Sequence, residues 1–162
     1  MRKIIFSTLI AQLQRAIYNE EGNYLILSDQ QLASLQQTSD QIDYVFKHFD
    51  LWNHNVEFIE QEMQWDTPAV FFDFQDLKYD TNQGRRRANF VVHLHIVSSV
   101  NYRYQEQSEA NSRFDLLDLP YKLLQLYNGN GITALTHIGS QTNNDHEDLV
   151  ESIETFAGWC VD

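Results

Sequence analysis

The sequence predicts an α+β fold: an antiparallel or mixed β-sheet packed against two main α-helices, as a single domain over residues 1–162. Three observations predict it. They are a helical apolar stripe at the start, two strand-like segments around a central turn signal, and a second helical segment before a closing strand pair. A length of 162 residues fits one domain, and 43% hydrophobic residues can fill a core.

The first third of the chain predicts one helix followed by shorter elements. Apolar residues within Ile4–Ile17 recur at helical spacing, which predicts a helix with one apolar stripe. Tyr24–Leu27 and Tyr44–Trp52 are apolar or aromatic runs that favour strands. Asp29–Asp43 is polar and fits either a polar helix or an exposed loop, and Asn55–Gln64 fits a short helix or a turn.

The middle of the chain predicts a pair of antiparallel strands. Pro68 precedes the apolar run Ala69–Phe74, and proline is tolerated where a strand begins. Ala88–Val97 alternates with the period of a strand, and Asn82-Gln83-Gly84 is a turn signal between the two runs. One predicted face of the second strand carries Ala88, Phe90, Val92, Leu94 and Ile96; the other carries Asn89, Val91, His93, His95 and Val97.

The last third predicts a helix and two strands. Phe114–Tyr127 has helical apolar spacing, with Pro120 either in the first turn of a shorter helix or at a kink. Asn128–Gly131 can end the helix, because Gly and Asn accept a left-handed backbone. Ile132–Ile138 and Val150–Val161 then read as the closing strand pair.

Charge and cysteine content exclude several classes of protein. There are 11 Lys and Arg against 23 Asp and Glu, so the net charge is 11 − 23 = −12. This excess of negative charge repels phosphate backbones, which disfavours a nucleic-acid-binding protein. It is compatible with a protein that lets DNA pass without binding it. Cys160 is the single cysteine, so no internal disulfide or cysteine-based metal cluster can form. Without a continuous apolar stretch near Met1 or a membrane-length one, we expect a protein of the cytoplasm.

His93 and His95 are the sharpest candidates for chemistry. Strand alternation places both imidazoles on one face, a geometry that some metal sites use. A zinc site needs a third ligand, for which His48, His54 and His137 are available, but no spacing brings any of them near. Such two-histidine strand patterns are common and more often reflect histidines packed against aromatic residues on a half-exposed strand face, so we expect no metal and no cofactor.

Two charged segments are candidate contact sites. Asp145, Glu147 and Asp148 form an acidic cluster that suits either a hard cation or a solvated hairpin tip. Arg85-Arg86-Arg87 is the one basic run; it either docks an acidic neighbour, including another copy of the chain, or guards an exposed strand. We expect these six residues to take part in a partner or oligomer interface.

Nucleophilic catalysis has little support. Ser98-Ser99 lacks the Gly-x-Ser-x-Gly elbow, Cys160 has no local base signature, and Asn128–Gly131 lacks the Lys-Ser/Thr of a phosphate loop. The sequence therefore predicts a protein that is not an enzyme.

Several segments resemble a known family. These are Leu51–Glu62, Trp65–Phe74 with its Pro68-Ala69-Val70-Phe71 strand, Leu94-His95-Ile96-Val97 and Phe114-Asp115-Leu116-Leu117-Asp118. They resemble small phage and prophage tail proteins of the tail-terminator, or tail-completion, family of long-tailed phages. The matching residues are of core type, and Pro120 departs from the continuous helix expected there.

The resemblance implies a structural role in the virion tail. Copies would close into a ring, often a hexamer, which ends tail-tube growth and binds the tail-tube protein and the head connector. DNA would pass through the ring. The alternatives are a head–tail adaptor, a tail-assembly protein that stays outside the virion, or a metal-binding protein that uses His93 and His95.

Overall fold

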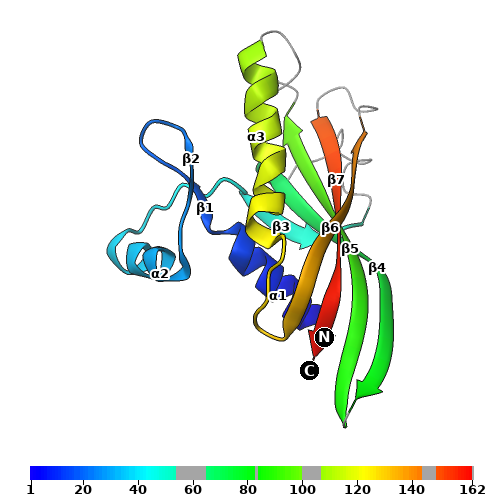
Figure 1. Ribbon diagram of the computed structural model, residues 1–162. Helices are drawn as coiled ribbons and strands as arrows, with labels where there is room; N and C mark the ends of the chain where they lie inside the picture. Colours follow the sequence, from blue (N-terminus) through cyan, green and yellow to red (C-terminus); the bar gives the residue numbers. More distant parts are fainter. Residues whose placement is uncertain (54–64, 83, 100–106, 144–148, 162) are drawn as a thin grey trace.

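The computed structural model describes residues 1–53, 65–82, 84–99, 107–143 and 149–161, which form three helices and two β-sheets (Figure 1). The helices are α1 (Arg2–Leu13), α2 (Asp29–Thr38) and α3 (Gln107–Leu124). The small sheet pairs β1 (Ala16–Tyr18) with β2 (Tyr24–Ile26). The large sheet contains β3 (His48–Leu51), β4 (Ala69–Asn82), β5 (Arg85–Ser99), β6 (Ile132–Asn143) and β7 (Leu149–Val161).

This content confirms the α+β class, but besides the two main helices it includes a third helix, at the segment expected to be either a polar helix or a loop, and a second sheet that the sequence did not predict. The large sheet has the strand order β3-β4-β5-β7-β6. It is mixed, because β3 runs parallel to β4 and every other pairing is antiparallel. The closing pair β6–β7 is confirmed, and β7 inserts beside β5, which leaves β6 as the outer strand.

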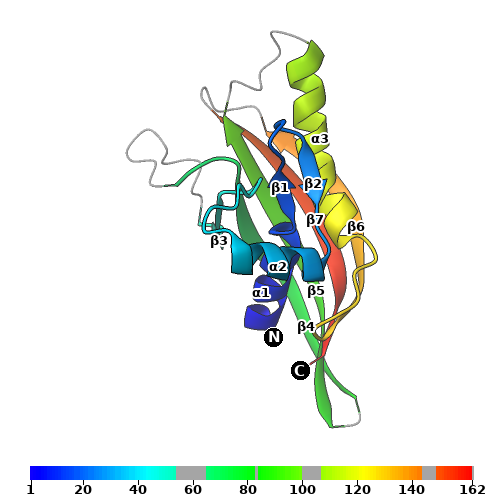
Figure 2. The same ribbon diagram turned by 90° about the vertical axis from the view of Figure 1, so that its left-hand side faces the viewer.

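The β4–β5 hairpin confirms the predicted antiparallel pair, and its pairing is as long as that between β5 and β7. Its register runs from Ala69 opposite Val97 to Asn82 opposite Arg85. Both strands extend further toward the tip than the predicted segments Ala69–Phe74 and Ala88–Val97: β4 continues to Asn82, and β5 already begins at Arg85. The hairpin tip projects past the end of β7 (Figures 1 and 2). A single shift of register lies between Phe74 and Asp76, where Gln75 is the extra residue of a β-bulge.

The core lies between the sheet and the helices, which all lie over the same face of the large sheet (Figure 2). The predicted apolar face of β5 is confirmed, because its five members are fully buried. Four of them, all but Ala88, share one apolar cluster with α1 and α3, whose contributions are Ile5, Leu9, Leu13, Leu116, Leu119, Leu123 and Leu124. The removal of such apolar side chains from water is the dominant favourable contribution to folding.

The first helix is shorter than the sequence predicts. It ends at Leu13, and Ala16 and Ile17 belong to β1 instead. Strand pairing decides this, because the Ala16 carbonyl accepts a hydrogen bond from the Val45 amide at 3.0 Å. Ile17 then packs in a separate small cluster with Leu27 and Leu32 rather than on the helix stripe.

The polar segment 29–43 adopts the helical alternative over Asp29–Thr38, so the loop alternative is wrong. A reciprocal cap starts α2: the Ser28 hydroxyl accepts from the Gln31 amide at 3.2 Å, and the Gln31 side chain accepts from the Ser28 amide at 2.8 Å. Of the strand predicted at Tyr44–Trp52, only His48–Leu51 forms a strand, which is β3. The segment Asn55–Gln64 lies outside the described residues.

The third helix begins at Gln107 rather than Phe114 and ends at Leu124 rather than Tyr127. Pro120 lies inside it, so the first-turn placement is wrong. An internal proline removes one backbone donor and costs about 3 kcal/mol. The buried leucines on both sides of Pro120, including Leu116, Leu119 and Leu123, offset this cost by holding the helix on the sheet. None of the described helices is both long and apolar enough to cross a bilayer.

Gly131 joins α3 to β6 at a position that suits no other residue, which leads to a prediction about stability. Its φ is 82°, and a Cβ there would lie 2.6 Å from the Val161 carbonyl oxygen. Gly22 has a similar φ of 79° but open space around it. Gly22→Ala should cost about 1–2 kcal/mol, the penalty of a left-handed backbone alone. Gly131→Ala should cost about 1–3 kcal/mol more, because the β6–β7 junction must also move.

Urea unfolding of the two variants measures this difference directly. If Gly22→Ala and Gly131→Ala lost equal free energy of unfolding, the close approach of the Val161 carbonyl would not constrain the position of Gly131.

Candidate functional site

Three potential ligand groups meet on the outer face of the large sheet, the face opposite the helices. Asp73 of β4 is the direct cross-strand partner of His93 of β5, and His95 lies two residues further along the same face. One donor atom from each of the three side chains lies within 4.8 Å of the others. We call Asp73, His93 and His95 the triad.

His95 is held rigidly at the buried side of the triad. The residue is 5% exposed, and its Nδ1 forms a short hydrogen bond with a carboxylate oxygen of Glu151 on β7. Its ring stacks on the Trp52 indole with the centroids 3.9 Å apart and the planes inclined by 8°. Its Nε2 is buried, has no hydrogen-bond partner among the described residues, and lies 4.0 Å from Asp73 Oδ2. With Nδ1–H donated to Glu151, Nε2 is left as a bare lone pair.

His93 and Asp73 form the more accessible side of the triad. Burial lowers the pKa of His93; the attraction of Asp73 opposes this effect, and repulsion by His95 adds to it. A lowered pKa favours the neutral imidazole, whose nitrogen can coordinate a cation. The Asp73 carboxylate also accepts a hydrogen bond from the Gln75 side-chain amide, so the bulge residue helps to orient it.

Of the three histidines proposed from sequence as third ligands, His48 and His137 do not reach the triad. His48 packs against Trp65 and Phe71, with ring centroids 6.2 and 5.7 Å away. His137 of β6 bonds to Glu154 at 2.6 Å, and Glu154 also accepts from Ser140 at 2.7 Å. His54 lies outside the described residues. The third group is a carboxylate, Asp73, which the sequence reading did not single out although it is the one charge within Ala69–Phe74.

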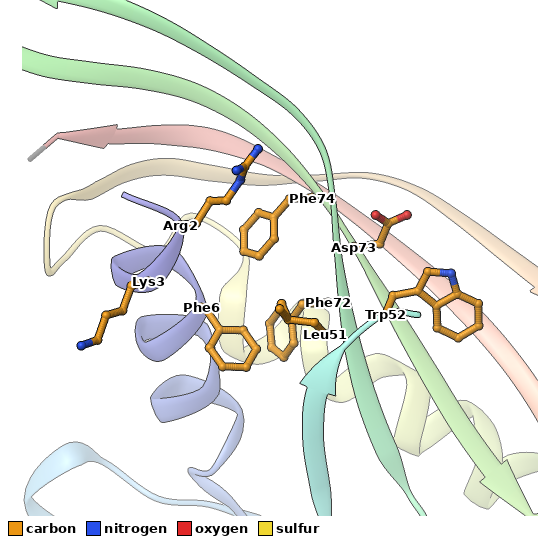
Figure 3. Close-up of a pocket in the computed structure, with 8 residues that line it drawn as sticks. All are labelled: Arg2, Lys3, Phe6, Leu51, Trp52, Phe72, Asp73 and Phe74. Atoms are coloured by element: carbon orange, nitrogen blue, oxygen red, sulfur yellow. The ribbon is translucent and has the colours of Figure 1, made fainter. Parts of the chain in front are cut away.

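A pocket of about 420 Å³ lies beside the triad, between α1 and the strands β3 and β4 (Figure 3). Its centre is apolar, and Phe6 contacts Phe72 edge-on at 4.9 Å. Arg2 and Lys3 stand at one side and Asp73 at the other. The full lining is Arg2, Lys3, Phe6, Leu51, Trp52, Phe72, Asp73 and Phe74. Asp73 therefore belongs to both the pocket and the triad.

Of the two charged segments proposed as contacts, the structure describes only the basic one. Arg85, Arg86 and Arg87 lie at the tip of the hairpin, where the Arg86 guanidinium is 4.1 Å from the Tyr79 ring centroid and that of Arg87 is 3.7 Å from Trp159. Both stackings are of cation–π type. Asp145, Glu147 and Asp148 lie outside the described residues.

The ends that flank this acidic segment can still be placed. Leu149 pairs with Ser99 and Val161 pairs with Arg87, so the acidic connection leaves the sheet at the end opposite the arginines.

Comparison with known proteins finds no matching family model and no matching curated protein.

The bond between His95 and Glu151 joins β5 to β7 across the outer face, and a double-mutant cycle measures its contribution. His95→Phe retains the stacking on Trp52, and Glu151→Leu removes the carboxylate. A hydrogen bond to a charged group contributes about 1.5–3 kcal/mol, so we expect a coupling energy in that range from urea unfolding in EDTA.

The matched control is a cycle between His95 and Glu154, which lies on the opposite face of β7. Its coupling should stay within about 0.5 kcal/mol, as is usual for residues that share no partner. Similar coupling energies in both cycles would contradict a specific His95–Glu151 bond.

Proposed function

We propose that this chain is a structural subunit of a phage or prophage tail, of the tail-terminator type, whose copies close into a ring. The ring would cap the tail tube and join it to the head connector. The sequence resemblance supplies the tail context. The observation that carries the assembly is that, among the described strands, the large sheet has two open edges with different surfaces, one along β3 and β4 and the other along β6.

The first edge comprises β3 and the outer side of β4. β3 pairs only with Ala69–Phe72, so β4 from Asp73 to Asn82 has β5 on one side and no strand on its outer side among the described residues. Leu51, 53% exposed, lies on this edge and lines the apolar pocket. Tyr79 is also exposed there. The first edge thus offers unpaired backbone groups together with a recess for an apolar side chain.

The second edge is β6, which pairs with β7 on one side only in the described part of the chain. Ile138 of β6 is 57% exposed. Tyr121 and Leu126, both exposed, lie near it: the Tyr121 ring contacts His137 at 5.8 Å, and the Leu126 amide donates to the Leu135 carbonyl at 2.8 Å. This edge combines a polar strand with a few protruding apolar side chains.

Two unlike edges on opposite sides of one sheet suit head-to-tail assembly. A contact between different surfaces generates a ring when the rotation closes. Open strand edges pair readily with another chain unless they are protected, and strand addition supplies backbone hydrogen bonds. We assign the neighbouring copy as the occupant of each edge, because the apolar recess on the first edge complements the protruding side chains on the second.

Charge supports the same arrangement. The basic hairpin tip lies at one end of the sheet, and Asn143 and Leu149, which flank the acidic segment in the sequence, lie at the other. A ring contact that joins the arginines of one copy to the acidic segment of the next would pair unlike charges. The net charge of −12 also suits a ring through which DNA must pass, because an acidic surface does not retain phosphate.

Single charges on either edge test the assembly. Ile138→Asp and Leu51→Asp should each prevent ring formation, because each places a carboxylate in one side of every contact. Phe114→Asp is the matched control, since Phe114 is as exposed as Ile138, at 57%, but lies on α3. Sedimentation velocity and negative-stain electron microscopy, with and without an added tail-tube protein, provide the readout.

A mixture of the two edge variants distinguishes head-to-tail contact from a symmetric one. Ile138→Asp retains an intact first edge and Leu51→Asp an intact second edge, so an equal mixture should form dimers but no rings. A wild-type chain that stays monomeric at high concentration, both alone and with the tube protein, would overturn the proposed function.

A further inference from the structure

We propose that the triad of Asp73, His93 and His95 binds a divalent first-row transition-metal ion, with Zn²⁺ as the reference ion. This site goes beyond the proposed function and does not depend on it. Two imidazole nitrogens and one carboxylate oxygen form a ligand set that Zn²⁺ accepts, whereas Mg²⁺ and Ca²⁺ prefer oxygen ligands.

The separations within the triad suit a shared cation better than a direct contact. His95 Nε2 and Asp73 Oδ2 are 4.0 Å apart, which is too long for a hydrogen bond. Ligands bound at about 2.0–2.2 Å to one tetrahedral zinc ion lie roughly 3.3 Å from each other. The three donor atoms, all within 4.8 Å, therefore need only small side-chain movements to meet around one ion.

The unpartnered Nε2 of His95 is the observation that points to a ligand. The His95 side chain is 6% exposed, and this nitrogen faces the Asp73 carboxylate. A buried polar atom without a partner costs about 1–3 kcal/mol, and native proteins rarely retain one without a reason. A cation between Nε2 and Asp73 would remove that cost and balance the negative charge of Asp73.

The groups around His95 match the surroundings of a metal-bound histidine. Such residues usually donate the other ring N–H to a carboxylate, which fixes the tautomer and orients the ring. Glu151 accepts from Nδ1 in this way, and the Trp52 indole holds the ring plane by stacking. His93 and Asp73 come from directly paired positions on adjacent strands, so a rigid hairpin sets their spacing.

A protonated His95 between two carboxylates is the competing explanation of the geometry. In that state Nε2–H would be expected to donate to Asp73 at roughly 2.7–3.2 Å, rather than remain 4.0 Å away. Three protein ligands also leave a coordination position open, as in zinc sites that hold a water or an incoming group. The metal site is therefore open to a donor from another molecule, including a neighbouring copy.

Metal titration of the full chain tests the proposal. The protein is prepared without a polyhistidine tag, stripped with chelator, and titrated with Co²⁺ while the visible d–d absorption is followed. Zn²⁺ then competes for the same site. We expect one ion per chain and a melting temperature that rises with Zn²⁺ and returns to the metal-free value with EDTA.

Variants locate the ion. His93→Gln and Asp73→Asn, whose side chains are not fully buried, should each weaken Co²⁺ binding at least about tenfold, the lower bound seen for groups that merely orient a ligand. His137→Gln is the matched control, because His137 also pairs with a buried carboxylate but lies outside the triad. It should leave the affinity unchanged, and circular dichroism verifies that all variants are folded.

Two outcomes would overturn the metal site. Wild-type protein that takes up neither ion supports the protonated His95 instead. Binding that survives both His93→Gln and Asp73→Asn places the ion elsewhere in the chain. Neither outcome bears on ring formation, which is read by sedimentation, so failure of the metal site and failure of the proposed function remain distinguishable.

Discussion

The arrangement of both sheet faces depends on one extra residue in β4, the bulge at Gln75. On the tip side of the bulge, Leu77 pairs with Phe90; on the base side, Phe74 pairs with Val92. Side chains alternate with a period of two, so an unbulged register would send every β4 side chain at the base to the opposite face. Asp73 would then stand opposite Leu94, within the apolar core. The bulge keeps Phe72 and Phe74 on the helix side and places Asp73 opposite His93.

This constraint gives the sheet two chemically different faces. On the helix side, β4, β5 and β7 contribute apolar side chains to one cluster that α1 and α3 cover. On the outer side, the same strands bury His95 and Glu151 beside a second small cluster containing Phe71, Trp52 and Trp65. A buried ionisable pair is stabilising only when its hydrogen bonds are satisfied. The bond to Glu151 satisfies Nδ1 of His95 and the Trp52 ring stacks on the imidazole, whereas Nε2 has no hydrogen-bond partner among the described residues.

Local patterns in the sequence predicted those parts of the fold that local forces decide. The alternation of Ala88–Val97 and the strand after Pro68 are confirmed because each segment has one apolar face to bury. Ala16 and Ile17 matched the helix period, yet pairing with β2 and Val45 placed them in a strand. Pro120 suggested a helix start, yet packing of the surrounding leucines carried the helix through it. The sequence predicted two of the three members of the triad, since the alternation of β5 placed His93 and His95 on one face. Asp73 joins them only through the bulge, which no pattern in the sequence marks.

Asp73 links the two proposals in a way that has a thermodynamic consequence. It begins the unpaired stretch of β4 on the first edge, it lines the apolar pocket, and it belongs to the triad. A neighbouring copy that pairs along this stretch would arrive beside the open coordination position. If that copy contributes a donor atom, the ion binds more tightly in the ring than in the monomer. Linkage then requires that the ion favours the ring by the same free energy. A metal dependence of ring stability would therefore follow from the position of one carboxylate at the border between a sheet face and a sheet edge.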